Sequence, residues 1–207
     1  MVTPEETARR FWREGMIYPS GSLIKPRRLH ELNYLVPRMG GVHSLTDVGC
    51  GDGALSACLW WLCDLSRVNG IDSRPPTWEP ISDSSTFQVR DVTTLDPYPA
   101  ADLAIMAGVI NYAFDDATAI RMLGNVRSDK LYVRSPCSML GDDQLVHGKS
   151  EALGTDYAAI YRTLPNMLRL MRSTGFLVMD YSRVYPDELE SPHGTKQYAF
   201  WCKRLDR

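Results

Sequence analysis

The segment 45–54 (LTDVGCGDGA) constrains the fold of this chain more than any other. A short β-type run carries the acidic residue Asp47 and leads into three glycines, after which the apolar run 54–63 begins. Glycine can turn the chain at positive φ and lets a ligand approach the backbone, and a helix that begins just after the turn offers free N–H groups. The pattern therefore predicts a strand, a ligand-binding turn and a helix.

The glycines alone leave the ligand open, because residues 49–54 also fit G-x-G-x-x-A, the dinucleotide-binding fingerprint. Acidic residues narrow the choice, since Asp72 and Asp91 follow the next two predicted strands. A carboxylate at the position of Asp72 can accept both ribose hydroxyls of a nucleoside, and one at Asp91 can accept from an adenine amino group. Asp47 would suit an ammonium group, because an ionised carboxylate at a strand end is costly without a cation or donors.

Strands and helices alternate from residue 44 onward, which favours a parallel sheet covered by helices on both faces. We expect strands at 44–48, 68–71, 87–89, 103–109 and 131–133, and helices at 54–65 and from Asp115 or Asp116 to about Leu123. The last third should begin with a helix over 157–171, with Asp156 as N-cap and a kink at Pro165. Two antiparallel strands, 176–185 and 197–202, should follow, because no crossover helix connects them.

Together these residues resemble the class I S-adenosylmethionine-dependent methyltransferases, over about residues 44–203. The segment with Asp47, Gly49, Cys50 and Gly51 resembles the first motif of that family, and Asp72 resembles its ribose-binding acid. Asp91-Val92 resembles its adenine-contacting pair, and residues 107–109, with Gly108, resemble the segment that closes its cofactor site. The resemblance implies a three-layer α/β/α Rossmann-like fold. Its sheet would have seven strands, mostly parallel, with one antiparallel strand in a C-terminal hairpin. A catalytic domain over 41–207 would follow a helical cap over 1–40.

The resemblance also implies the chemistry. S-adenosylmethionine would be the cofactor and S-adenosylhomocysteine the product, after in-line attack by a substrate nucleophile on the sulfonium methyl. A nicotinamide-dependent oxidoreductase is an alternative, although Asp47, the antiparallel end and the lack of a Tyr-x-x-x-Lys pair argue against it. A catalytically silent binding module that keeps the cofactor fold is another alternative.

The acceptor side of the site offers several candidates. Tyr112 and His147 are the catalytic candidates, with His147 expected in a polar loop after the fifth strand as a general base. Asn111 follows the fourth strand and is expected to contact the substrate. Arg134 continues the fifth strand, and Arg162 is expected on an otherwise apolar helix. Either guanidinium could hold an anionic group of the substrate bidentately.

Four further interpretations concern other segments of the chain. His193, in a polar segment, is a second candidate base, and the turn 18–22 is a candidate hinge for a lid over the cofactor. Trp60 and Trp61 are expected to pack in the core. The family's N6-adenine and glutamine enzymes carry Asn-Pro-Pro-Tyr or a close variant after the fourth strand, whereas residues 109–112 lack both prolines, which argues against amino-group chemistry on nucleic-acid bases.

Composition limits the partners. The chain has 23 Lys and Arg against 25 Asp and Glu, without the basic excess of proteins that bind nucleic-acid phosphates. The apolar run 54–63 is about half of the roughly 20 residues that span a bilayer, and the N-terminus lacks the apolar core of a signal peptide. Five cysteines without a C-x-x-C pair indicate free thiols and no metal site. We therefore expect a cytoplasmic monomer or homodimer that methylates a small molecule, with oxygen favoured over nitrogen as acceptor.

Overall fold

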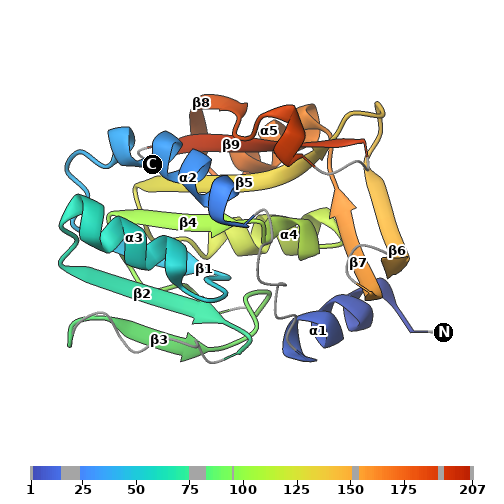
Figure 1. Cartoon of the computed structure of the whole chain (residues 1–207), viewed down its shortest axis with the longest axis horizontal. Coiled ribbons are helices and arrows are strands. Elements are labelled where there is room, and N and C mark those ends of the chain that lie inside the picture. The colour runs from blue at the N-terminus through green and yellow to red at the C-terminus, as the bar shows by residue number, and fades with distance from the viewer. Residues whose placement is uncertain are drawn as a thin grey trace.

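A seven-stranded sheet forms the centre of the computed structural model (Figure 1), which describes residues 2–14, 24–74, 83–94, 96–150, 154–190 and 194–205. The strands of this sheet are β1 (Ser44–Val48), β2 (Arg67–Asp72), β3 (Thr86–Val89), β4 (Leu103–Ala107), β5 (Lys130–Ser138), β8 (Phe176–Arg183) and β9 (Thr195–Arg204). Their order is β3-β2-β1-β4-β5-β9-β8. Strands β1 to β5 pair in parallel, and β9 runs antiparallel to both β5 and β8. The predicted sheet, with its antiparallel C-terminal strand, is confirmed.

Four of the five described helices cover the two faces of the sheet, and the other, α1 (Pro4–Glu14), lies beyond the strand ends (Figure 1). The four are α2 (Ile24–Leu35), α3 (Ala54–Cys63), α4 (Asp116–Gly124) and α5 (Leu164–Ser173), with 3₁₀ turns η1 (Val36–Arg38), η2 (Ile110–Tyr112) and η3 (Asp187–Leu189). One apolar cluster joins α4 and α5 to the sheet, and a second joins α2 and α3 to its other face. The molecule therefore has the three-layer arrangement that the alternation of elements predicts.

A cap lies beyond the carboxyl ends of the parallel strands (Figure 1). It consists of α1 and a separate two-stranded hairpin, β6 (Gln144–Ser150) and β7 (Thr155–Tyr161). Helix α1 begins with a capping box, because Thr3 Oγ1 accepts from the backbone N–H of Glu6 and a Glu6 carboxylate oxygen accepts from the N–H of Thr3. None of the described helices has the length and apolar character needed to cross a membrane.

The hairpin corrects two predictions. Residues 155–161 form β7 rather than the first half of a helix, and α5 begins only at Leu164, with the side chain of Thr163 as N-cap. Tyr157 and Tyr161 fit helical spacing with the leucines that follow. At the strand period of two, however, they also lie on one face together with Ala159. Pro165 lies in the first turn of α5, where its missing N–H has no partner to lose, so it does not mark a kink. Residues 144–150, predicted as a polar loop, form β6.

Four smaller sequence-based predictions have different outcomes. Trp61 is 77% exposed, so its predicted place in the core is wrong, whereas Trp60 is partly buried against the cluster under α2 and α3. The N-cap of α4 is confirmed as Asp115, whose carboxylate accepts from the N–H of Thr118. The hinge proposed at 18–22 and the candidate base His193 lie outside the described residues.

Candidate functional site

The glycine turn after β1 is bonded directly to the end of β2. The N–H groups of Gly49 and Cys50 both donate to the carbonyl of Ile71, at 2.7 and 3.1 Å. Asp72, the last residue of β2, accepts from the N–H of Gly51 through Oδ2 at 2.9 Å. The predicted glycine motif and the predicted ribose-binding acid therefore form one connected unit.

Two glycines allow the backbone to approach its neighbours closely. Gly49 has φ +73°, and a Cβ built on it would lie 2.0 Å from Cγ2 of Val109, which follows β4. Gly108 has φ +76°, and its Cβ would lie 3.0 Å from Nη2 of Arg134. By contrast, a Cβ on Gly51 (φ +56°) would have no atom of the described residues within 4 Å. The turn is therefore packed tightly below Gly49 and open at Gly51, as a ligand-binding turn requires.

Asp47 is the most perturbed acid of this unit. Its side chain is 2% exposed, and Oδ2 accepts from Ser56 Oγ of α3 at 2.5 Å. Burial raises its pKa to about 7 against the lowering effect of the Ser56 bond, and the nearby carboxylates of Glu31, Asp72 and Asp52 raise it further. The turn is thus a site where a cation would be stabilised.

Glu31 of α2 is a buried acid that sequence reasoning missed. It accepts from the hydroxyl of Tyr132 at 2.9 Å and from Nε of Arg134 at 3.0 Å. Arg134 Nη1 donates to Oε1 of Gln197. The guanidinium predicted to hold an anionic substrate is therefore engaged by Glu31 and Gln197. The only sequence signal for the ion pair between Glu31 and Arg134 was a glutamate on the inner side of a helix.

Asp91 lies where α1 reaches the sheet edge. Its Oδ1 accepts from the N–H and hydroxyl of Thr93, and its Oδ2 lies 3.5 Å from Nε of Arg9. Val92, the next residue, accepts through its carbonyl from the hydroxyl of Tyr98. Helix α1 thus covers the end of the site where the adenine is expected.

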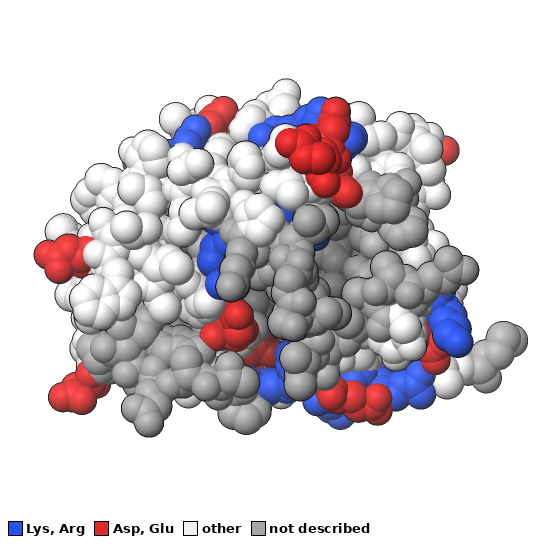
Figure 2. Space-filling model, in the orientation of Figure 1, with Lys and Arg blue, Asp and Glu red and all other residues white. Residues whose placement is uncertain are grey.

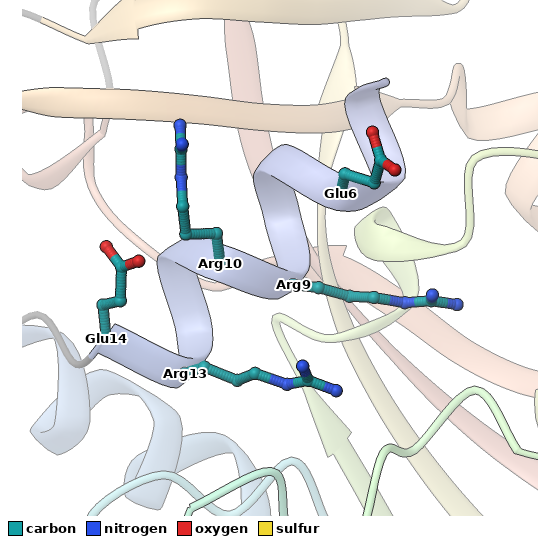
Figure 3. A pocket seen from close by; sticks show the side chains of 5 residues that line it. All are labelled: Glu6, Arg9, Arg10, Arg13 and Glu14. Atoms are coloured by element: carbon teal, nitrogen blue, oxygen red, sulfur yellow. The ribbon is translucent and has the colours of Figure 1, made fainter. Parts of the chain in front are cut away.

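The surface of α1 beside this contact is charged. A depression there is lined by Glu6, Arg9, Arg10, Arg13 and Glu14 (Figure 3). Arg9 and Arg13 point to the same side of the helix, and Arg10 points away from them toward Asp156 of β7, with which it pairs at 2.9 Å (Figure 3). Basic and acidic side chains are mixed along this edge of the molecule (Figure 2).

The candidates after β4 lie under the cap. Asn111 is 3% exposed, and its Oδ1 has no hydrogen-bond partner among the described residues. The hydroxyl of Tyr112 lies 3.4 Å from that of Tyr157 in β7, and the Trp12 ring of α1 meets the Tyr112 ring edge-on with centroids 5.1 Å apart. Trp12 and Tyr157 were missed, because only the tertiary structure brings α1 and β7 to this strand end.

Arg162 does not lie on a helix, contrary to the sequence-based prediction. It lies between β7 and α5, and its side chain is 1% exposed. Nη2 donates to the carbonyl of Ala113 at 2.7 Å, Nη1 to that of Ile110 at 3.4 Å, and Nε faces Asp116 at 3.4 Å. A buried guanidinium needs such partners. Arg162 therefore holds the segment that carries Asn111 and Tyr112, and a substrate-binding role for it stays a prediction.

His147 lies on β6, not in a loop, and is exposed. Its Nε2 is 3.0 Å from Oγ1 of Thr7, a buried residue of α1. This contact fastens α1 to the hairpin. A general-base role for His147 stays a prediction.

The cysteines are free thiols. Cys50, in the glycine turn, is buried, and burial raises the pKa of its thiol, so it stays protonated. Among the described residues, no group of three or more His, Cys, Asp or Glu side chains is arranged to hold a metal ion.

Solved structures share this fold. A 1,6-didemethyltoxoflavin-N1-methyltransferase from Burkholderia thailandensis, with S-adenosylhomocysteine bound, matches with a TM-score of 0.67 at 19% identity over 90% of this chain and 80% of that chain. A methyltransferase from Leishmania major matches with a TM-score of 0.69 at 15% identity over 97% and 83%. Magnesium protoporphyrin IX methyltransferase from Synechocystis matches with a TM-score of 0.61 at 15% identity over 95% and 89%. No protein-family model and no curated protein matches the sequence.

The chain therefore has the Rossmann-like fold of the class I S-adenosylmethionine-dependent methyltransferases, as the sequence predicts. The fold does not decide the reaction, since SpnF, named as a [4+2]-cyclase, shares it with a TM-score of 0.61. The activity has to be argued from the site.

Proposed function

We propose that this protein is an S-adenosylmethionine-dependent methyltransferase acting on a small molecule, with oxygen favoured over nitrogen as the acceptor atom. The observation that carries the proposal is the set of carboxylates around the glycine turn. Burial raises the pKa of Asp47, and three of these carboxylates, Glu31, Asp72 and Asp52, raise it further. S-adenosylmethionine brings an ammonium and a sulfonium to such a site, whereas the pyrophosphate of a nicotinamide cofactor would bring negative charge.

The residues that line the sheet edge fit this cofactor one by one. Asp47 would hold the ammonium, the turn Gly49-Cys50-Gly51 would pass beneath the methionine portion, and Gly108 would close that side. Asp72 would exchange its bond from Gly51 for bonds from the ribose hydroxyls. Asp91 and Val92 would contact the adenine. These assignments extend the sequence-based expectation and are supported by the connected geometry of the turn and β2.

The bound cofactor would supply an electrophilic methyl group. The chain's own contribution would be alignment and exclusion of water, because α1 and the β6–β7 hairpin lie over the strand ends. Of the N-terminal segment 1–40, α1 would thus act as a cap over the catalytic domain 41–207, together with the β6–β7 hairpin of that domain, whereas α2 packs on the sheet. A base is needed only for a protonated nucleophile, and Tyr112 and His147 are the candidates.

Calorimetric titration with S-adenosylhomocysteine and with NADH tests the proposal. We expect S-adenosylhomocysteine to bind and NADH not to bind. Asp72→Ala should weaken S-adenosylhomocysteine about tenfold to a hundredfold, the loss expected for hydrogen bonds to a charged group. Asp187→Ala, an exposed acid on η3, is the matched control and should bind normally. NADH binding alone, or unchanged affinity in Asp72→Ala, would refute the assignment.

A further inference from the structure

Aromatic rings from three separate elements gather at the end of β4. We call them the aromatic cluster: Phe11 and Trp12 of α1, Tyr112 of η2, and Tyr157 and Tyr161 of β7. The Trp12 and Tyr112 rings meet edge-on at 5.1 Å between centroids, and the Phe11 and Tyr157 rings at 5.3 Å. The cluster therefore connects the cap to the strand end from which Asn111 projects.

Two buried polar atoms at this cluster have no hydrogen-bond partner among the described residues. They are Nε1 of Trp12, a donor, and Oδ1 of Asn111, an acceptor. Trp12 contacts Tyr112, and Asn111 precedes Tyr112 in the chain, so both residues lie next to Tyr112. A buried polar atom without a partner costs about 1–3 kcal/mol, so native structures rarely keep one without a reason. A ligand that satisfies both atoms is such a reason.

The cluster offers aromatic surface and neutral polar groups. The hydroxyl of Tyr157 lies 3.4 Å from the hydroxyls of both Tyr112 and Tyr161. Burial raises the pKa of Tyr157 far above its ordinary value, so this phenol stays neutral. The nearby guanidinium of Arg162 donates to backbone carbonyls and faces Asp116. An anionic acceptor would therefore meet no uncommitted guanidinium from Arg162, whereas a flat neutral ring would meet aromatic faces.

We infer that the acceptor is a planar aromatic or heteroaromatic molecule, which receives a hydrogen bond from Trp12 and donates one to Asn111. This inference rests on the proposed methyltransferase function. In the transfer, a lone pair of the acceptor's hydroxyl oxygen forms the O–CH₃ bond while the S–CH₃ bond breaks and its electron pair stays on sulfur. The hydroxyl proton leaves to solvent or to a base.

The cap must move for a ring to insert between the aromatic side chains. Polar contacts between α1 and the rest of the molecule include Arg9 with Asp91, Arg10 with Asp156 and Thr7 with His147. The two ion pairs are substantially exposed, and exposed pairs contribute about 0–1 kcal/mol each. Opening α1 would also separate the buried ring of Phe11 from Tyr157 and the ring of Trp12 from Tyr112, so apolar contacts contribute more than the ion pairs to holding α1 in place.

The test is calorimetric titration of the S-adenosylhomocysteine complex with 4-quinolone, which has one N–H donor and one carbonyl acceptor, and with quinoline, which lacks the donor. Citrate serves as an aliphatic anionic probe. We expect 4-quinolone to bind at least about tenfold more tightly than quinoline, the value of one to two hydrogen bonds, and citrate not to bind. Asn111→Leu should reduce that preference severalfold or more, because it removes the acceptor for the N–H of 4-quinolone. Trp12→Phe should weaken the binding of 4-quinolone itself severalfold or more, because it removes the donor to the carbonyl. Both variants should still bind S-adenosylhomocysteine.

Trp61→Phe, a conservative change at an exposed tryptophan, is the matched control and should leave every affinity unchanged. Trp12→Phe keeps an aromatic ring and should fold even if Asn111→Leu does not. Failure of the wild type to bind S-adenosylhomocysteine would refute the proposed function. Three results, each with normal S-adenosylhomocysteine binding, would refute the aromatic-acceptor inference alone. They are citrate preferred over 4-quinolone, no preference for 4-quinolone over quinoline, and an affinity for 4-quinolone that Trp12→Phe leaves unaltered.

Discussion

Replacement of Asp47 by Asn should make the ligand-free protein more stable at pH 8 and abolish its affinity for S-adenosylmethionine. Burial raises the pKa of Asp47 from 3.8 to about 7. Between these values the unfolded chain releases the proton while the folded chain keeps it, so stability falls as the pH rises. A shift of about three pKa units at 1.36 kcal/mol each amounts to about 4 kcal/mol above pH 7.

Asparagine removes this titration and still offers Ser56 Oγ an acceptor oxygen. Urea denaturation at pH 4, 6 and 8 should therefore show a stability difference that favours Asp47→Asn by up to about 4 kcal/mol at pH 8 and that falls toward zero at pH 4. Calorimetry on the same samples should show the loss of cofactor affinity, because the ammonium loses its carboxylate.

Asp102→Asn is the control with the opposite sign. Burial acts to raise the pKa of Asp102, but hydrogen bonds from the N–H groups of His43 and Ser44 and from the Ser44 hydroxyl outweigh it, and the pKa is lowered. This carboxylate stabilises the fold above its unfolded pKa and loses that contribution as the pH falls. Asp102→Asn should thus be less stable at pH 8. A stability difference for Asp47→Asn that is independent of pH, or that favours the wild type at pH 8, would refute the account of Asp47.

The remaining predictions concern packing and access. Gly49→Ala should lower the free energy of unfolding in urea by about 2–4 kcal/mol, because the strain of a positive φ and the clash with Val109 add. Gly51→Ala, at a positive φ but with open space for the Cβ, should lower it by only about 1–2 kcal/mol. Equal losses for the two variants would contradict the close approach of Gly49 to Val109. Arg162→Met should lower the free energy of unfolding by about 3 kcal/mol, because the buried carbonyls of Ile110 and Ala113 lose their donors. It should also raise the KM for the acceptor while the affinity for S-adenosylhomocysteine is retained. An unchanged KM would contradict the positioning role of Arg162. Ellman's reagent should rapidly modify only the partly exposed thiols, Cys58 and Cys63, and reaction of all five in the folded protein would contradict their burial.

The sheet and the cofactor edge could be predicted because their signals are local. A strand that ends at glycines before an apolar helix has few alternatives, and the acids Asp72 and Asp91 stand directly after β-type runs. Parallel strands then bring their carboxyl ends to one edge, so the predicted residues meet without any long-range information.

The cap and the buried pairs could not be predicted because their signals are not local. Tyr157 and Tyr161 fit both a helix and a strand, and only the pairing of β7 with β6 decides between them. Glu31 meets Arg134 across more than 100 residues, and Trp12 meets Tyr112 across 100 residues. The place of Arg162 was misjudged for the same reason, since its partners are backbone carbonyls, which no sequence pattern marks.

The most direct test of the central claim is an amide ¹H–¹⁵N NMR titration of the assigned protein with S-adenosylhomocysteine. The account predicts that the largest shifts occur at the glycine turn 49–53, at the residues after β2 and β3, including Asp91 and Val92, and at Gly108. It also predicts small shifts at the opposite, amino-terminal edge of the parallel strands. Saturable shifts confined to that opposite edge, or none at a ligand excess, would contradict the placement of the cofactor at this site.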